Sequence, residues 1–500
     1  MTRKTVLRGG LVCDGTGTDP VPGEILLEDG LIAATGAPGT FRGETEAEII
    51  DCTGRIAAPG FIDAHSHGER RKLRFPDNRS KLLQGITTEV DGNCGVSHAS
   101  VPGEAGEARW SDYNGYVRQL EACPVSTNTV LLCGHNTIRA AVMGTSSAAP
   151  SSDQLKTMRR MLEDAFAAGA AGWSTGLTYF PGKFAATEEL EALSAATRGT
   201  EKIYATHMRS EGDELLEAVE EAVRIARSGS ARLQVSHLKT IFRRNFHKID
   251  DLMNTLESAR SGGLFLHADR YPYIYSSTNI RQALPPPYFF DHDIASKMRA
   301  SPALREEVTA ALKDCPRDLP TTVIPRLGRD LTELAAERGV PVEQVCAEII
   351  MNNPDELAAY RCMSPENLKR ILLTPWVCAG TDGLSMTLDD PADNGHPRGI
   401  GSFPRFFRMT ADELGVGEAV RKMTSLPARI FRIPQRGEIR PGYVADLVIF
   451  DSEKFDSEAG FRGEKRMPSG LDRVIVAGRT AWCAAEPEQV ERHGRYIPIN

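Results

Sequence analysis

The sequence predicts an α/β protein: a (β/α)8 barrel of the TIM type, with a small β-sandwich domain built from both chain ends and a helical insertion in the barrel. Three observations predict this fold. Short apolar runs alternate with helical periods through the middle of the 500-residue chain, as in parallel β/α units. Both ends contain closely spaced short strands instead. A helix-rich stretch from about 285 to 375 is too long for one ordinary connection.

The two chain ends have the same strand-and-turn character. Apolar runs separated by Gly and Asp turn signals extend from Thr5–Leu7 to Ile49–Asp51, and similar runs at Ala445–Phe450 and Arg473–Ala477 lie near the other end. Because the two ends of a domain often lie close together, we expect both to join one sandwich. The expected division is residues 1–57 for its first part, 58–432 for the barrel and 433–500 for its second part.

The middle of the chain switches repeatedly between the two periods. Expected strands are Thr129–Leu132, Gly172–Thr175, Tyr204–His207, Arg232–Ser236 and Leu264–Ala268. Expected helices between them are Ser152–Ala168, Thr187–Thr197, Glu211–Ser228 and a segment reaching Arg260. This alternation is what an eight-unit barrel requires.

Composition excludes several classes of protein. With 59 Lys and Arg against 67 Asp and Glu, the net charge is −8, and no basic run suggests a nucleic-acid partner. No apolar stretch approaches the roughly 18–20 residues of a membrane helix, and the N-terminus lacks a signal-peptide core. Ten scattered cysteines without a CxxC pair indicate free thiols in a reducing compartment. We therefore expect a cytoplasmic protein with a small-molecule partner; the oligomeric state is not indicated.

The strongest local signal is a short apolar strand that ends in His65 and His67. On a strand, residues at i and i+2 point to the same side, as two ligands of one metal must. A chance pair of histidines would have the same pattern, so HxH alone is a weak signal.

Further metal-ligating residues lie at the ends of other expected strands. Cys94, His207, His237 and Asp382 each occupy such a position, and the carboxyl ends of barrel strands converge on one mouth. Any one of them could be a packed core residue or a turn residue. Together they form a coherent zinc ligand set. His267-Ala268-Asp269 also ends a strand and could contact the ligands from behind.

These features resemble the amidohydrolase superfamily, and more closely its N-acyl-D-amino-acid deacylases (D-aminoacylases). The resemblance runs nearly end to end. Its motifs are Gly92-Asn93-Cys94-Gly95, Gly176-Leu177-Thr178-Tyr179, Ser236-His237-Leu238-Lys239, Tyr271-Pro272-Tyr273 and His396-Pro397-Arg398.

The resemblance implies a metal centre in which a cysteine replaces the carboxylated lysine that bridges two metals in hydantoinases and dihydroorotases. Cys94, His207 and His237 would hold one Zn²⁺ tightly. His65 and His67 would form a second, weaker zinc site, and Asp382 would be both a ligand and the general base. Gly68-Glu69-Arg70-Arg71 departs from the acidic residues that tend to follow the second histidine in this family.

The resemblance also implies a catalytic cycle. Asp382 would take a proton from the attacking water and return it to the leaving amine. Lys239 and Arg398 would hold the substrate α-carboxylate, with hydrogen bonds from Tyr179 and Tyr271. Arg281 could bind an acidic side chain, which would favour N-acyl-D-glutamate or N-acyl-D-aspartate; a solvated arginine is the alternative.

The expected function is therefore zinc-dependent hydrolysis of N-acyl-D-amino acids, with selectivity for D-substrates taken from the resemblance. The nearest alternative is a cyclic-amide hydrolase of the hydantoinase or dihydroorotase type. It is disfavoured because no convincing bridging lysine occurs on the fourth expected barrel strand. A non-catalytic amidohydrolase-like scaffold is the other alternative, but such proteins typically lose ligands, and here every expected ligand is present.

Overall fold

Eight parallel strands form the centre of the protein, in a computed structural model that describes residues 3–105, 108–285, 287–291, 293–388, 395–462 and 465–500. In spatial order they are β8 (Phe61–Asp63), β9 (Ile86–Asp91), β12 (Asn128–Gly134), β13 (Gly172–Gly176), β14 (Ile203–His207), β15 (Arg232–Val235), β16 (Leu266–Arg270) and β21 (Val377–Ala379). Just beyond the first and last strands, Ser66 pairs with Gly383, and the Asp382 amide donates to the His65 carbonyl at 2.8 Å. The predicted barrel is confirmed.

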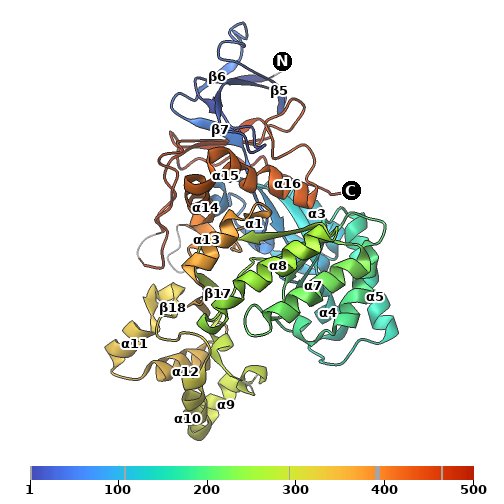
Figure 1. Cartoon of the computed structure of the whole chain (residues 1–500), viewed down its shortest axis with the longest axis vertical. Coiled ribbons are helices and arrows are strands. Elements are labelled where there is room, and N and C mark those ends of the chain that lie inside the picture. The colour runs from blue at the N-terminus through green and yellow to red at the C-terminus, as the bar shows by residue number, and fades with distance from the viewer. Residues whose placement is uncertain (1–2, 106–107, 286, 292, 389–394, 463–464) are drawn as a thin grey trace.

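Helices surround this barrel (Figure 1). They are α1 (Glu69–Arg74), α2 (Arg79–Leu82), α3 (Tyr113–Ala122), α4 (His135–Met143), α5 (Ser152–Ala167), α6 (Thr187–Ser194), α7 (Leu215–Gly229), α8 (Ile249–Ser261), α13 (Pro365–Leu373), α14 (Arg398–Leu414), α15 (Val416–Met423) and α16 (Ser425–Phe431). A capping box between Ser151 and Gln154 begins α5. The helix expected from Glu211 begins at Leu215 instead, and the residues from Glu211 to Glu214 line a cavity described below. None of the described helices is long and apolar enough to cross a bilayer.

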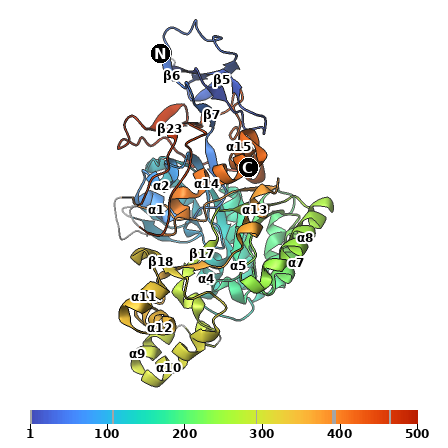
Figure 2. The same cartoon turned by 60° about the vertical axis from the view of Figure 1, so that its left-hand side comes forward.

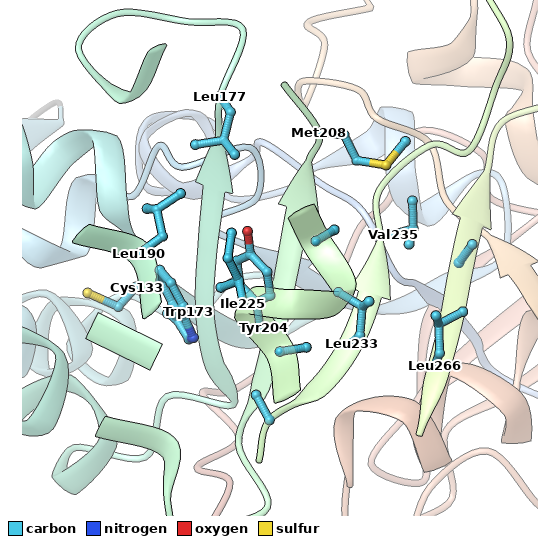
Figure 3. Packing of buried hydrophobic residues seen from close by; sticks show 14 of the residues in the cluster. Cys133, Trp173, Leu177, Leu190, Tyr204, Met208, Ile225, Leu233, Val235 and Leu266 are labelled. Atoms are coloured by element: carbon cyan, nitrogen blue, oxygen red, sulfur yellow. The ribbon is translucent and has the colours of Figure 1, made fainter. Parts of the chain in front are cut away.

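Aromatic and aliphatic side chains fill the layer between the strands and these helices (Figure 3). The rings of Trp173 and Tyr204, on neighbouring strands, stack with centroids 4.5 Å apart. Leu233 and Leu266 continue the layer across β15 and β16, and Ile225 enters it from α7. Burying this much apolar area stabilises the β/α units and holds the strand ends in fixed positions.

Two further sheets form the sandwich at one end of the molecule (Figure 1). One contains β5 (Leu31–Gly36), β4 (Glu24–Glu28), β1 (Lys4–Arg8) and β6 (Glu48–Asp51); the other contains β24 (Arg479–Cys483), β23 (Leu471–Val476), β22 (Leu447–Phe450), β7 (Ile56–Pro59), β2 (Leu11–Val12) and β3 (Val21–Pro22). Strands β7 and β22 are antiparallel neighbours, so both chain ends share one sheet. Buried side chains such as Ile25 and Leu447 pack together in one cluster. The boundaries at residues 57 and 432 stay a prediction.

The last residues of the chain lie against the barrel rather than within the sandwich sheets. Gly494 and Tyr496 form bridges with Val125 and Thr129, next to the start of β12. Ile497 and the neighbouring Ile499 are buried with residues of the barrel strands and α16. This end of the chain therefore covers the end of the barrel at which the strands begin.

The insertion is a mixed α/β unit at the opposite end from the sandwich (Figure 2). A four-stranded sheet orders β17 (Tyr275–Asn279), β20 (Leu357–Arg361), β18 (Val323–Ile324) and β19 (Arg329–Asp330), next to α9 (Ile294–Ala300), α10 (Pro302–Ala311), α11 (Leu331–Arg338) and α12 (Val342–Asn352). It therefore begins earlier than expected and is not purely helical. The polar sequence of β17 hid that strand, because all five of its residues are only half-buried.

Candidate metal centre

A cavity of about 730 Å³ lies at the carboxyl ends of the barrel strands. Residues that end or follow β14 and β15 line one part of it, including His207 and His237. The insertion contributes another part, from β17 and the loop that contains Arg317. This is the mouth at which barrel enzymes keep their sites.

Cys94 lies among three imidazoles at the base of this cavity. Its Sγ atom is 3.3 Å from His65 Nε2, 3.4 Å from His237 Nε2 and 3.8 Å from His207 Nδ1. The ligand atoms of two groups lie within 4.8 Å of one another: His65, His67, Cys94 and Asp382 in one group, and Cys94, His207 and His237 in the other. The structure thus brings together all six predicted metal ligands, and Cys94 belongs to both groups.

The backbone carrying these ligands is strained. Cys94, His237 and Asp382 have φ values of +51°, +36° and +48°, a region that non-glycine residues rarely adopt. Gly92, two residues before Cys94, lies so close to strand β12 that a side chain there would be 2.3 Å from the Leu132 carbonyl oxygen. Strain of this kind concentrates where a side chain must be aimed at one point.

Electrostatics favour the ligand form of the thiol. Burial alone would raise the pKa of Cys94, but the imidazoles of His65 and His237 hold it well below its usual range. Burial alone would lower the pKa of His65, but the carboxylate of Asp269 and the Cys94 sulfur hold it well above. A thiolate next to the protonated imidazole of His65 can exchange that proton for a bound cation.

Asp382 contacts both histidines that follow β8, His65 and His67, and also the guanidinium of Arg398. Its Oδ1 lies 3.1 Å from His67 Nε2 and 3.5 Å from His65 Nε2, while Oδ2 lies 2.6 Å from Arg398 Nη1. Burial alone would raise the pKa of this carboxyl, but Arg398 and nearby imidazoles hold it well below its usual range. The carboxylate is therefore ionised and faces the predicted ligands.

A buried lysine fixes the loop that carries Asp382. Lys81 Nζ lies 2.7 Å from Asp63 Oδ2 and 2.6 Å from Thr381 Oγ1, and all three side chains are fully buried. Asp63 also accepts from the backbone amides of His65 and Thr381. The sequence reasoning missed Lys81, because nothing in the pattern of a short polar helix indicates a partner 300 residues away.

Glu211 is a second residue that the sequence reasoning missed. One carboxylate oxygen lies 3.0 Å from His237 Nδ1 and 2.5 Å from Lys239 Nζ, and the other lies 3.6 Å from His207 Nε2. Its spacing of four residues after His207 is the only sequence signal that could have found it. Glu211 contacts the far side of two predicted ligands and orients both rings.

Four of the five predicted substrate contacts line the cavity: Tyr179, Lys239, Tyr271 and Arg398. The Tyr179 ring lies 4.9 Å from that of His207. The Tyr271 hydroxyl is buried and has no hydrogen-bond partner among the described residues, which leaves it available to a ligand.

Arg281 is the exception, since it does not line the cavity. Its Nη2 atom donates to the backbone carbonyl of Asp291 at 2.5 Å. Arg281 lies in a 3-10 turn, Ile280–Ala283, where successive side chains point about 120° apart. The next residue, Gln282, lines the cavity in its place.

The fourth barrel strand bears on the cyclic-amide alternative. Strand β13 has the sequence Gly-Trp-Ser-Thr-Gly and contains no lysine that could bridge two metals. Cys94 instead approaches the imidazoles, from the turn after the second barrel strand, β9.

Comparison with known proteins shows several relatives that match nearly the whole chain. The amidohydrolase family matches residues 48–348 and 367–481. D-aminoacylase of Alcaligenes xylosoxydans xylosoxydans is 34% identical over 95% of this chain and 94% of its own length. N-acyl-D-aspartate deacylase of the same organism is 32% identical over 99% and 96%. A similar solved structure is the crystal structure of N-acyl-D-glutamate deacylase from Bordetella bronchiseptica, complexed with zinc and a phosphonate mimic of the tetrahedral intermediate. It superposes with a TM-score of 0.81, at 31% identity and with 99% of both chains covered.

Proposed function

Because the chain belongs to the amidohydrolase family, among its N-acyl-D-amino-acid deacylases, which hydrolyse linear amides, we propose that it cleaves N-acyl-D-amino acids to a carboxylate and a free D-amino acid with zinc as its metal. The substrate is a small molecule, and acidic side chains, those of D-glutamate and D-aspartate, are preferred. One observation carries this proposal: a buried Cys94 whose sulfur lies within 4 Å of three imidazoles at the base of a cavity.

The donor set fits zinc. Thiolate and imidazole together are ligands that Zn²⁺ prefers over Mg²⁺ or Ca²⁺, which take oxygen donors. Cys94, His207 and His237 hold the tightly bound ion, and His65 and His67, with Asp382, form the weaker second site. When bound, zinc polarises the amide carbonyl and lowers the pKa of water.

Asp382 handles the proton. Its ionised carboxylate accepts the proton of the attacking water and passes it to the amide nitrogen, without which the amine is a poor leaving group. Its position at the cavity wall, 3.1 Å from His67, supports this role.

Lys239 and Arg398 hold the substrate α-carboxylate, and Tyr179 and Tyr271 donate hydrogen bonds to it or to the acyl carbonyl. The unpartnered hydroxyl of Tyr271 supports its role. Lys239 also contacts Glu211, and Arg398 also contacts Asp382. Both cations that bind the substrate are therefore already held in place next to the predicted metal ligands.

We infer the compartment from the cysteines. All ten are free thiols, including Cys315 and Cys483, which are only partly buried. This supports our inference that the enzyme works in the reducing cytoplasm.

The test is primary-amine release from paired N-acetyl-D- and N-acetyl-L-amino acids, with and without added zinc. We expect release from D-forms only, and its loss in Cys94→Ala. Release from both the D- and the L-enantiomers would contradict the D-selectivity. Zinc binding with no release across the panel would favour a cyclic-amide hydrolase, and a protein with neither zinc nor activity would be a scaffold.

A further inference from the structure

Arginine and lysine side chains line the cavity, and most of them already have acidic partners. The partners of Arg209, Lys239 and Arg398 are Glu221 at 2.8 Å, Glu211 at 2.5 Å and Asp382 at 2.6 Å. Arg317, from the insertion, differs from these three. In the part of the chain that the structure describes, no carboxylate lies within ion-pair distance of its guanidinium. A half-buried guanidinium without a counter-ion favours an anionic ligand.

Arg317 is held firmly by neutral contacts. Its Nε atom donates to the Gln282 carbonyl at 3.1 Å. The guanidinium carbon lies 4.4 Å from the centre of the Tyr360 ring and 5.6 Å from that of Phe242. These contacts use the Nε atom and the faces of the group, and leave the Nη1 and Nη2 atoms without a hydrogen-bond partner among the described residues. Together those two atoms can bind a carboxylate in a bidentate manner.

The backbone of Phe242 supports a built site. Its φ of +67° is an outlier for a bulky residue, and its amide donates to the Cys362 carbonyl at 3.0 Å. Phe242 lines the cavity and lies next to Arg317. Strain held in place at a cavity wall is typical of a residue that positions a functional group.

The wall that the insertion adds to the cavity is polar throughout. Ser276, Ser277 and Thr278 of β17 line it together with Gln282 and Arg317. An aliphatic substrate side chain against this wall would leave hydroxyl, amide and guanidinium groups without water or a partner. A carboxylate would accept hydrogen bonds from them.

We propose that Arg317 is the specificity-determining residue, which binds the side-chain carboxylate of an N-acyl-D-glutamate or N-acyl-D-aspartate, with the β17 hydroxyls as neighbours. This inference rests on the proposed deacylase function and gives to Arg317 the role that the sequence suggested for Arg281.

The experiment compares N-acetyl-D-glutamate with N-acetyl-D-glutamine, which differ in side-chain charge but hardly in shape. In Arg317→Met, kcat/KM for the glutamate substrate should fall about tenfold to hundredfold, mostly through KM, because a charge-assisted hydrogen bond is lost. The glutamine substrate, whose side-chain oxygen is uncharged, should lose clearly less than the glutamate substrate, and its remaining turnover reports an intact fold. Arg317→Lys should restore part of the glutamate activity.

Arg281→Met tests the alternative that Arg281 binds the side-chain carboxylate. Arg281 also lies in the insertion, but outside the cavity. Loss of the glutamate preference in that variant instead of Arg317→Met would overturn the assignment, as would equal losses on both substrates. If Arg317→Met does not fold, Arg317→Gln is measured on the same pair. An unmodified enzyme that hydrolyses D-leucine or D-methionine substrates but not the glutamate one would overturn this inference alone. Inactivity on every D-substrate would overturn the proposed function with it.

Discussion

Oδ1 of Asp269 lies 3.0 Å from Nδ1 of His65. The same oxygen accepts the backbone amide of His237 at 2.8 Å, so one carboxylate on β16 holds predicted ligands from two other strands. Gln234 donates to its second oxygen at 2.9 Å. With Nδ1 occupied in this way, Nε2 of His65 faces the Cys94 sulfur.

Replacing this carboxylate should weaken the metal centre. In Asp269→Asn we expect zinc affinity or activity to fall about 10- to 100-fold, because the ring of His65 loses its charged partner. Zinc content after competition with a chelator measures the loss. Asp250→Asn, which removes an exposed partner of Arg370, is the control and should keep its zinc. Unchanged zinc affinity in Asp269→Asn would contradict the positioning role.

Cys94 should be the cysteine that the zinc requires. Cys94→Ser should lose the tightly bound ion and nearly all activity, because a serine hydroxyl is not ionised at neutral pH. Cys133→Ser alters another fully buried cysteine, 3.2 Å from Ser100, and should keep the ion. Metal content by mass spectrometry distinguishes the two, and an ion retained in Cys94→Ser would refute the ligand assignment.

Lys81→Met should destabilise the protein severely. The variant leaves Asp63 buried without its cation, which typically costs about 3–5 kcal/mol. Lys156→Met is the matched control, since its pair with Asp153 is exposed and should contribute little. The measurement is the unfolding temperature of the two variants and of the unmodified protein. Equal temperatures would show that the contacts of Lys81 with Asp63 and Thr381 are not needed for stability.

The buried side chain of Lys422 should make the stability of the folded protein depend on pH. Burial lowers the pKa of this lysine from 10.5 to about 7, next to the Thr374 carbonyl that it contacts. Since the folded pKa lies below the unfolded one, stability decreases as the pH falls from about 10 to about 7 and is constant below that range.

Lys422→Met removes this titration. Relative to the unmodified protein, the variant should therefore gain stability at pH 7 and lose that gain toward pH 10. Thermal unfolding of both proteins across this pH range gives the difference directly. A difference that does not change with pH would show that Lys422 remains charged when buried.

The sequence was enough to predict the barrel and the candidate ligand residues that it brings together. Both follow from one rule: strands with the right period lie in parallel, so their ends meet. Contacts that depend on how one loop packs against another could not be predicted in this way. Glu211 contacts His237, and Lys81 contacts Thr381. The partners lie so far apart in the sequence that no local sequence pattern indicates the contact. Arg281 failed as a cavity residue for a similar reason, because a single 3-10 turn decided which neighbour faced inward.

The shared sheet of the sandwich has a consequence for the order of assembly. Ala58 of β7 pairs with Val448 of β22, so an early strand has no partner on this edge until almost the whole chain has been synthesised. At roughly 5–20 residues per second, that delay is on the order of tens of seconds. During this time an apolar strand edge directly before the first barrel strand stays open to other chains. Yield in the cell therefore depends on protection of the nascent N-terminal segment, and a circular permutant that places β22 before β7 should need less of it.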